Sequence, residues 1–310
     1  MFTTSKTLRL AASALALSLA SGTLAQAADL EGTLAKAKET GVIAIGFQEA
    51  SLPFSYLDGD QKPVGYTLDI CEKIVDAIRT EIGAPDLKIE YVSANSANRI
   101  PLVVNETIDL HCASATNNLE RQKQVDFLNS HFVTASAFVS KKADAIKSID
   151  DLKGRTVVSV SGSTNLNQLN KVNTERNLGI NVVGVKDQLE AFMMLETDRA
   201  DAYVMDDVQL ATGAARTKDP SVYVISSETF SLPEPYGIII RKNDPQLKAV
   251  ANKATADLYR SEEMQKIYDK WFNSPIPPNG VNFNYPTPPA LLQAWAHPSD
   301  SADPAAYAPK

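Results

Sequence analysis

The chain has 310 residues, of which 44% are hydrophobic and 22% are charged, so it can bury a substantial core and is neither disordered nor a coiled coil. Lysine and arginine total 30 against 37 aspartates and glutamates, which gives a formal net charge of −7. An acidic chain lacks the electrostatic attraction that nucleic acid or an anionic membrane requires, so we expect neither as a partner.

The N-terminus has the order of segments that is typical of a secretory signal peptide. Lys6 and Arg9 precede an apolar run at residues 10–24, and small residues follow up to Ala27. The run is diluted by alanine and serine and is short for a membrane span, although a membrane anchor or a buried helix is the alternative interpretation. We therefore expect cleavage after about Ala27, removal of residues 1–27 and export of a soluble protein.

Cysteine and histidine are too few and too scattered for a disulfide-rich protein or a metalloenzyme. Export permits a disulfide between Cys71 and Cys112, but with no C-x-x-C pair in a chain of this size we interpret them as buried thiols. His111, His131 and His297 do not have the spacing of metal ligands. We expect no metal and no cofactor.

The first predicted elements form a strand–helix–strand module. Strands are predicted at residues 42–45 and 87–91, from a short apolar run and from apolar alternation, respectively. Between them, isoleucine recurs every four residues from Ile70 to Ile82, which predicts an amphipathic helix with one buried face. Alternation of strands and helices is typical of α/β proteins.

A second α/β region follows. Its predicted elements, in chain order, are strand 156–160, a polar helix to about Val172, strand 181–185, helix 189–195, strand 202–205 and strand 222–225. A strand at 236–241 and two helices with apolar spacing come next. Two α/β regions joined by extended segments predict a two-lobed protein with a ligand cleft between the lobes.

The segment from Tyr285 onward is rich in proline. Proline lacks a backbone N–H and disrupts regular structure in the interior of helices and strands. We therefore expect an extended or loose tail that is dispensable for the function of the protein.

The sequence contains no G-x-x-x-x-G-K, G-x-G-x-x-G, G-x-S-x-G or H-E-x-x-H motif, so it does not predict the catalytic or nucleotide-binding chemistry of those motifs. Polar clusters instead follow predicted strands, where side chains and free backbone amides point into a crevice. We therefore assign binding residues and no catalytic residue.

The largest polar cluster spans residues 114–121. In it, Thr116 offers a hydroxyl and a backbone N–H, and the planar guanidinium of Arg121 matches a carboxylate through two parallel hydrogen bonds. The alternative is that these residues cap the next helix and that Arg121 lies on a solvated face.

Two smaller clusters lie in the second region. Residues 161–164, Ser-Gly-Ser-Thr, begin a predicted helix whose N-terminus can bind an anion, although serine and threonine are also ordinary N-caps. Asp206 and Asp207 end an apolar strand and can bind an ammonium group or cap the following helix. Each cluster by itself leaves both interpretations open.

Taken together, these clusters and several other segments match one known family. The matching segments are residues 53–56, 65–66, 98–102, 116–124, 151–154, 205–207, 236–237 and 270–278. From about residue 34 to residue 278, the chain resembles the periplasmic glutamate/aspartate-binding proteins of ABC importers, a subgroup of the polar amino-acid solute-binding proteins. The runs Asn-Asn-Leu-Glu-Arg and Trp-Phe…Pro-Ile-Pro-Pro are specific to that subgroup rather than to the fold.

The resemblance implies an α/β, two-lobed periplasmic-binding-protein fold of type II, with the ligand cleft between the lobes. Two strands, near residues 132–138 and 230–238, would cross between the lobes. The implied division is signal peptide 1–27, first lobe 28–135 and 232–283, second lobe 136–231 and proline-rich tail 284–310.

The resemblance also implies how the two charged ends of an amino acid are held. Arg121 with Thr116 would hold the α-carboxylate, Asp206 with Ser114 would hold the α-ammonium, and Thr164 would reach the ligand from the second lobe. This agrees with the physical requirement that both charges of a zwitterion be paired when they leave water.

The resemblance places Ser96 and Arg99 at the ligand side chain, but two positions depart from the acidic-ligand pattern. This chain has Gln48 where the family has an arginine, and Gln188 where it has a histidine. Loss of a charged partner of a buried carboxylate costs about 2–5 kcal/mol, whereas Arg99 still offers a bidentate pair. The expected ligand is a polar L-amino acid, either glutamate or aspartate, or glutamine or asparagine.

The implied protein is not an enzyme. It is a monomeric periplasmic protein that closes on a free L-amino acid by hinge motion and delivers it to the permease membrane subunits of an ABC transporter. The alternative is a periplasmic lyase or dehydratase on the same fold, which would need a general acid in the cleft. Neither His111 nor His131 falls at a ligand-contact position of the matched segments.

Overall fold

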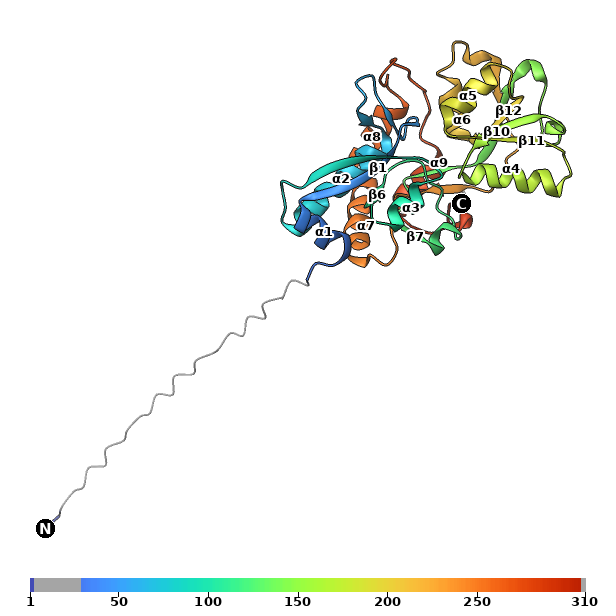
Figure 1. The fold of residues 1–310 in the computed structure, drawn as a ribbon. Helices are drawn as coiled ribbons and strands as arrows, with labels where there is room; N and C mark the ends of the chain where they lie inside the picture. Colours follow the sequence, from blue (N-terminus) through green and yellow to red (C-terminus); the bar gives the residue numbers. More distant parts are fainter. Residues whose placement is uncertain (3–28, 308–310) are drawn as a thin grey trace.

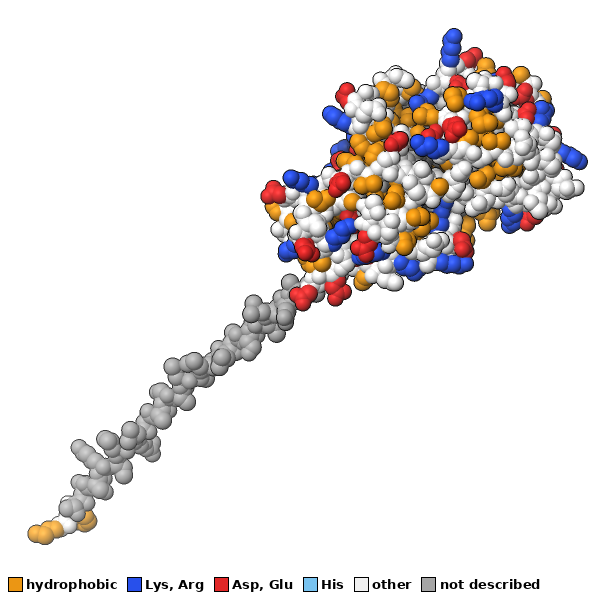
Figure 2. Space-filling model, viewed as in Figure 1, with side chains coloured by type: hydrophobic (Ala, Val, Ile, Leu, Met, Phe, Trp, Pro, Cys, Tyr) orange, Lys and Arg blue, Asp and Glu red, His pale blue; other side chains and the backbone are white. Residues whose placement is uncertain are grey.

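The computed structural model describes residues 1–2 and 29–307, so the predicted signal peptide lies almost entirely outside the described residues. Within the described part of the chain, no helix combines the length and the apolar character needed to cross a membrane. The described chain forms two α/β lobes that lie side by side (Figure 1). On the face shown in Figure 2, basic and acidic side chains are interspersed over both lobes.

The first lobe is built around a five-stranded sheet. Its strands are β1 (Val42–Gln48), β5 (Lys88–Ala94), β6 (Leu110–His111), β7 (Val125–Phe127) and β15 (Ile239–Arg241). The strand order is β5-β1-β6-β15-β7; β1 pairs in parallel with β5 and β6, and β15 runs antiparallel to β6 and β7. Because β1 and β6 are parallel, the residues that follow them meet at one edge of the sheet.

Most helices of the first lobe share one hydrophobic core with this sheet. The helices are α1 (Gly32–Thr40), α2 (Tyr66–Ile82), α3 (Arg99–Val104), α7 (Pro245–Tyr259) and α8 (Glu262–Phe272). Of these, α3 packs in a separate cluster with β7 and β15. The predicted amphipathic helix is confirmed as α2, in which the regularly spaced isoleucines are buried. The helix ends where Gly83 adopts a left-handed conformation with φ of 63°, which favours glycine.

A small antiparallel sheet extends from the first lobe, and single turns of 3₁₀ helix occur in both lobes. The small sheet consists of β2 (Ala50–Ser51), β3 (Ser55–Leu57) and β4 (Pro63–Val64). The 3₁₀ helices are η1 (Arg121–Lys123), η2 (Lys142–Asp144), η3 (Asp150–Leu152), η4 (Pro220–Val222) and η5 (Pro304–Tyr307).

The second lobe has its own five-stranded sheet. Its strands are β9 (Ser136–Lys141), β10 (Thr156–Val160), β11 (Asn181–Val185), β12 (Ala202–Asp206) and β13 (Tyr223–Ile225), in the order β11-β10-β12-β9-β13. The helices are α4 (Thr164–Glu175), α5 (Gln188–Glu196) and α6 (Asp207–Ala214). The strands predicted at 156–160 and 181–185 are confirmed to the residue.

The two lobes are joined by a two-stranded antiparallel sheet of β8 (Phe132–Thr134) and β14 (Glu234–Tyr236). β8 leads directly into β9 of the second sheet, and β14 leads back toward β15 of the first. The predicted two-lobed α/β architecture with two crossing strands is therefore confirmed.

The C-terminal segment is packed, so the prediction of a loose tail is wrong. It contains helix α9 (Pro289–Ala296), in which Leu291 and Trp295 are buried in the core of the first lobe. Tyr307 is also buried, in a small cluster with Val133 of β8. The high proline content suggested a loose tail. Pro289, however, is the first residue of α9, a position where proline fits a helix.

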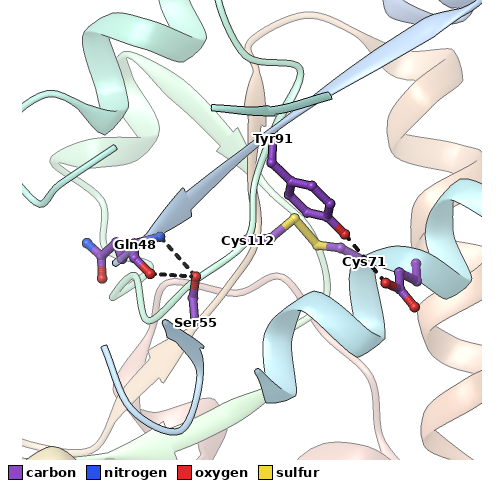
Figure 3. The surroundings of a disulfide bond; sticks show 6 residues. Gln48, Ser55, Cys71, Tyr91 and Cys112 are labelled. Carbon is purple, nitrogen blue, oxygen red and sulfur yellow. Dashed lines mark hydrogen bonds between the residues drawn. A yellow bond between two sulfur atoms is a disulfide. The ribbon is translucent and has the colours of Figure 1, made fainter. Parts of the chain in front are cut away.

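Cys71 and Cys112 form a disulfide, with their Cα atoms 6.4 Å apart, so the interpretation as free thiols is wrong (Figure 3). Both residues are fully buried, as expected. The sequence did not reveal the bond because the two cysteines are 41 residues apart and meet only through the packing of α2 against the sheet. The bond ties α2 to the loop that follows β6.

Candidate functional site

The predicted binding residues lie at strand ends and helix starts between the lobes. From the first lobe, Gln48 ends β1, Ser96 follows β5, Arg99 begins α3, Ser114 and Thr116 follow β6, and Arg121 begins η1. From the second lobe, Thr164 begins α4, Gln188 begins α5 and Asp206 ends β12. Such positions are where side chains and free backbone amides face a ligand in open α/β sheets.

Thr116, Arg121 and Thr164 come together across the junction of the lobes. The hydroxyl oxygens of Thr116 and Thr164 are 3.2 Å apart. Arg121 Nη1 donates to the Thr116 carbonyl at 2.7 Å, and Nη2 donates to the Gly162 carbonyl of the second lobe at 3.3 Å. Arg121 is only 9% exposed, so the alternative of a solvated face is wrong for this residue.

The charge of the Arg121 guanidinium is desolvated, and two carboxylates compensate for it. Burial lowers the pKa of Arg121, while the negative charges of Glu234 and Asp206 oppose this shift. Hydrogen bonds to the backbone N–H groups of a helix start, the other alternative for these clusters, are made by two of their own members, Asn118 and Ser163. Asn118 Oδ1 accepts from the Arg121 backbone N–H at 2.9 Å, and Ser163 Oγ accepts from the Leu166 N–H at 3.1 Å.

Asp206 is the acidic group of the second lobe and is 2% exposed. Its carboxylate accepts hydrogen bonds from Asn165 Nδ2 at 2.9 Å and from the Tyr236 hydroxyl of β14. Burial raises the pKa of Asp206, and these two hydrogen bonds oppose the rise. The Asp206 side chain does not cap α6. The next residue, Asp207, bonds to the start of the helix instead, because its Oδ1 accepts from the Val208 N–H at 2.6 Å.

Ser114 belongs to a polar cluster that also crosses between the lobes. Its hydroxyl lies 2.7 Å from the Ser51 hydroxyl and accepts from Gln209 Nε2 of α6 at 3.0 Å. Within the described residues, the structure gives Ser114 no hydrogen bond to Asp206; its carbonyl accepts from Arg99 Nη1 at 3.0 Å. The Ser114 carbonyl therefore helps to hold the Arg99 guanidinium in place. Its hydroxyl takes part in the contact with Gln209 of the second lobe.

Arg99 is a second buried guanidinium, 2% exposed, at the start of α3. Burial and the nearby charge of Arg121 lower the pKa of Arg99. Its Nε has no hydrogen-bond partner among the described residues. A buried donor without a partner is costly, so this atom suits an acceptor such as a ligand oxygen.

Gln48 and Gln188, which depart from the acidic-ligand pattern, line one cavity together with Ser96. Gln48 and Ser96 contribute from the first lobe and Gln188 from the second. Gln48 Nε2 donates to Ser96 Oγ at 3.3 Å, and the Gln48 backbone N–H donates to Ser55 Oγ at 2.9 Å (Figure 3). Gln188 also lines a neighbouring cavity that includes Arg216 and Phe192. The site thus has an amide-lined region beside its charged region.

Sequence reasoning missed Glu234, the first residue of β14. It is 8% exposed, and its Oε2 accepts from Thr116 Oγ1 at 3.2 Å and from Thr164 Oγ1 at 3.4 Å, while Gln168 donates to the other oxygen. Burial and the charge of Asp206 raise the pKa of Glu234 to about 7. An acidic residue within a predicted crossing strand was the signal available in the sequence.

Comparison with known proteins identifies the family. The family described as bacterial extracellular solute-binding proteins, family 3, matches residues 43–274. The chain belongs to this family. Its matched region runs from β1 to the end of α8 and therefore includes both sheets and both crossing strands.

Two curated relatives cover nearly the whole chain. It is 46% identical over 275 residues to the L-glutamate/L-aspartate-binding protein of Pseudomonas aeruginosa, covering 88% of this chain and 91% of the relative. It is 40% identical over 292 residues to the glutamate/aspartate import solute-binding protein of Escherichia coli, covering 93% of this chain and 96% of the relative. The resemblance inferred from the sequence segments is therefore confirmed.

Solved structures show the same two-lobed fold. An ancestral arginine-binding protein bound to arginine has a TM-score of 0.67 and 34% identity, covering 75% of this chain and 98% of that chain. A mutant of the arginine-binding protein of T. maritima has a TM-score of 0.69 and 27% identity, covering 78% of this chain and all of that chain. The predicted type II fold is thereby confirmed.

Proposed function

We propose that this protein is a periplasmic, monomeric component of an ABC importer that binds a free polar L-amino acid between its lobes and delivers it to the membrane subunits. Membership of a solute-binding family and the names of the relatives support this proposal. The family is one of binding proteins, and the protein is not an enzyme. His111 and His131 are fully buried, and burial lowers the pKa of both, that of His131 to about 3, which disfavours the imidazolium that a general acid needs.

The observation that carries the proposal is a buried cation and a buried anion in different lobes. Arg121 of the first lobe reaches the Gly162 carbonyl of the second lobe, and Asp206 of the second lobe is bound by Tyr236 of a crossing strand. An amino-acid zwitterion has a carboxylate for the one and an ammonium for the other, so binding pairs both charges and connects both lobes. Binding therefore favours the closed arrangement of the lobes.

We propose glutamate and aspartate as the preferred ligands. Relatives at 40–46% identity carry these names, and Arg99 supplies a second buried guanidinium, whose Nε has no partner within residues 29–307 and suits a side-chain carboxylate. Glutamine and asparagine are the second candidates, because Gln48 and Gln188 line one cavity and amide groups pair readily with amide groups. The lobe division at residues 135/136 and 231/232 is part of the same proposal.

Calorimetry on unfolded, dialysed and refolded protein tests this function. Each of L-glutamate, L-aspartate, L-glutamine and L-asparagine is titrated separately, and at least one of them is expected to bind. Arg121→Ala should weaken that binding about 30-fold or more, because loss of a buried partner of a carboxylate costs about 2–5 kcal/mol. Arg260→Ala, at an exposed position, is the matched control and should bind as the wild type does. Near-native affinity of the Arg121 variant contradicts the proposed site.

A further inference from the structure

The carboxylate of Glu234 lies where the two lobes and a crossing strand meet. Its Oε2 accepts hydrogen bonds from Thr116 of the first lobe and Thr164 of the second, and its Oε1 accepts one from Gln168 of α4. Glu234 therefore contacts both lobes while it belongs to β14, which is part of neither large sheet.

The same two hydroxyls belong to the proposed site for the ligand α-carboxylate. A threonine hydroxyl has one proton and can donate it to only one acceptor at a time. In the structure, both hydroxyls lie within hydrogen-bonding distance of Glu234 Oε2. A ligand carboxylate and the Glu234 carboxylate therefore compete for the same donors.

The charges around Glu234 disfavour a second ionised carboxylate beside it. Arg121 of η1 is the cation that faces Glu234, Asp206 of β12 is a like charge, and Tyr236 of the same strand is a neutral phenol whose pKa burial raises further. Arg99 of α3 faces Arg121 and Asp206 instead. When two carboxylates share one site, one of them binds a proton more readily.

We propose that an incoming amino acid displaces the Glu234 carboxylate from the threonine hydroxyls, and that Glu234 takes up one proton from solvent as it does so. This inference rests on the proposed function. Glu234 is then a binding-site residue that competes with the ligand when ionised and ceases to compete when protonated. Affinity should therefore depend on pH although the α-carboxylate and α-ammonium of the ligand do not titrate near neutrality.

The direction of this dependence follows from linkage. The pKa of Glu234 is about 7, so most of the free protein carries a protonated Glu234 at pH 6 and an ionised one at pH 8. Binding favours the protonated form, so the ligand must compete at pH 8 and hardly at all at pH 6. We expect affinity to fall about tenfold between pH 6 and pH 8.

Calorimetry in two buffers tests the coupling. At pH 8, the observed binding enthalpy of the wild type in phosphate and in Tris should differ by the amount that corresponds to uptake of nearly one proton per ligand. Glu234→Gln keeps an acceptor for the hydroxyls but cannot titrate, so its enthalpies should agree between buffers and its affinity should be constant from pH 6 to pH 8. Glu175→Gln, an exposed carboxylate of α4, is the matched control and should behave as the wild type does.

The outcomes separate the two proposals. Failure of L-glutamate, L-aspartate, L-glutamine and L-asparagine all to bind overturns both proposals. Binding with equal enthalpies in the two buffers overturns the coupling alone, and this comparison uses the wild type, so it does not depend on the folding of any variant. Proton uptake that persists in Glu234→Gln assigns the proton to another group and also overturns the inference.

Discussion

The charged region and the amide region of the candidate site are built differently. The charged region contains Arg121, Asp206 and Glu234, and its hydrogen bonds run between the lobes and the crossing strands. The amide region contains Gln48 and Gln188, which line one cavity from the two lobes, and Gln48 bonds to Ser96 of its own lobe. Under the proposed function, the charged region would bind the α-carboxylate and α-ammonium that all amino acids share, and the amide region would face the side chain that distinguishes them.

This difference predicts that substitutions in the charged region weaken all ligands alike, whereas substitutions in the amide region change the preference between ligands. The largest expected effect is that of Asp206→Asn. Loss of the proposed buried partner of the α-ammonium should weaken the binding of every ligand by about 30-fold or more. Isothermal calorimetry measures the change, with Asp198→Asn at an exposed position as the control. A loss confined to one ligand would show that Asp206 contacts a side chain.

Gln48→Arg should have a smaller effect and a different pattern. The added guanidinium strengthens recognition of a side-chain carboxylate but offers nothing new to the α-groups. We expect the affinity ratio of glutamate to glutamine to rise by about tenfold, the equivalent of 1.4 kcal/mol. Competition between the two ligands, followed by thermal shift, gives this ratio. Equal changes for both ligands would contradict the separation of the two regions.

The smallest expected effect is that of Thr164→Val. This change removes one hydroxyl from the charged region at nearly constant volume, and a single hydrogen bond contributes about 1 kcal/mol, or about fivefold in affinity. Thr174→Val, on the exposed face of the same helix, should leave affinity unchanged. An unchanged affinity for Thr164→Val would place the ligand carboxylate away from α4.

Periodicity predicted the regular elements well because a buried face leaves a local pattern in the sequence. The isoleucines of α2 and the apolar run of β10 are examples, and their positions agree with the structure. Local patterns failed where a residue's role depends on distant packing. Cys71 and Cys112 meet only after α2 packs on the sheet, and Pro289 looked like a helix breaker until its place at a helix start was known.

The candidate site was predictable only in part for the same reason. Arg121 and Thr164 were singled out because their residue types suit an anion, and the structure brings Thr164 close to Thr116 and Arg121 close to Gly162. Glu234 was missed because an acidic residue in a connecting strand has no local signature of burial. Its pKa is raised first by burial and then by the charge of Asp206, and both depend on segments from other parts of the chain.

The bond between Cys71 and Cys112 has a consequence for where the protein reaches its mature form. It closes a loop that includes β5 and α3, and it holds the backbone just ahead of Ser114 against α2. A cross-link over this length of chain contributes about 4 kcal/mol by restricting the unfolded chain, and it survives only in an oxidising environment. Under the proposed function, export from the reducing cytosol would allow this bond to form and to hold the backbone ahead of Ser114, beside the proposed binding cleft, against α2.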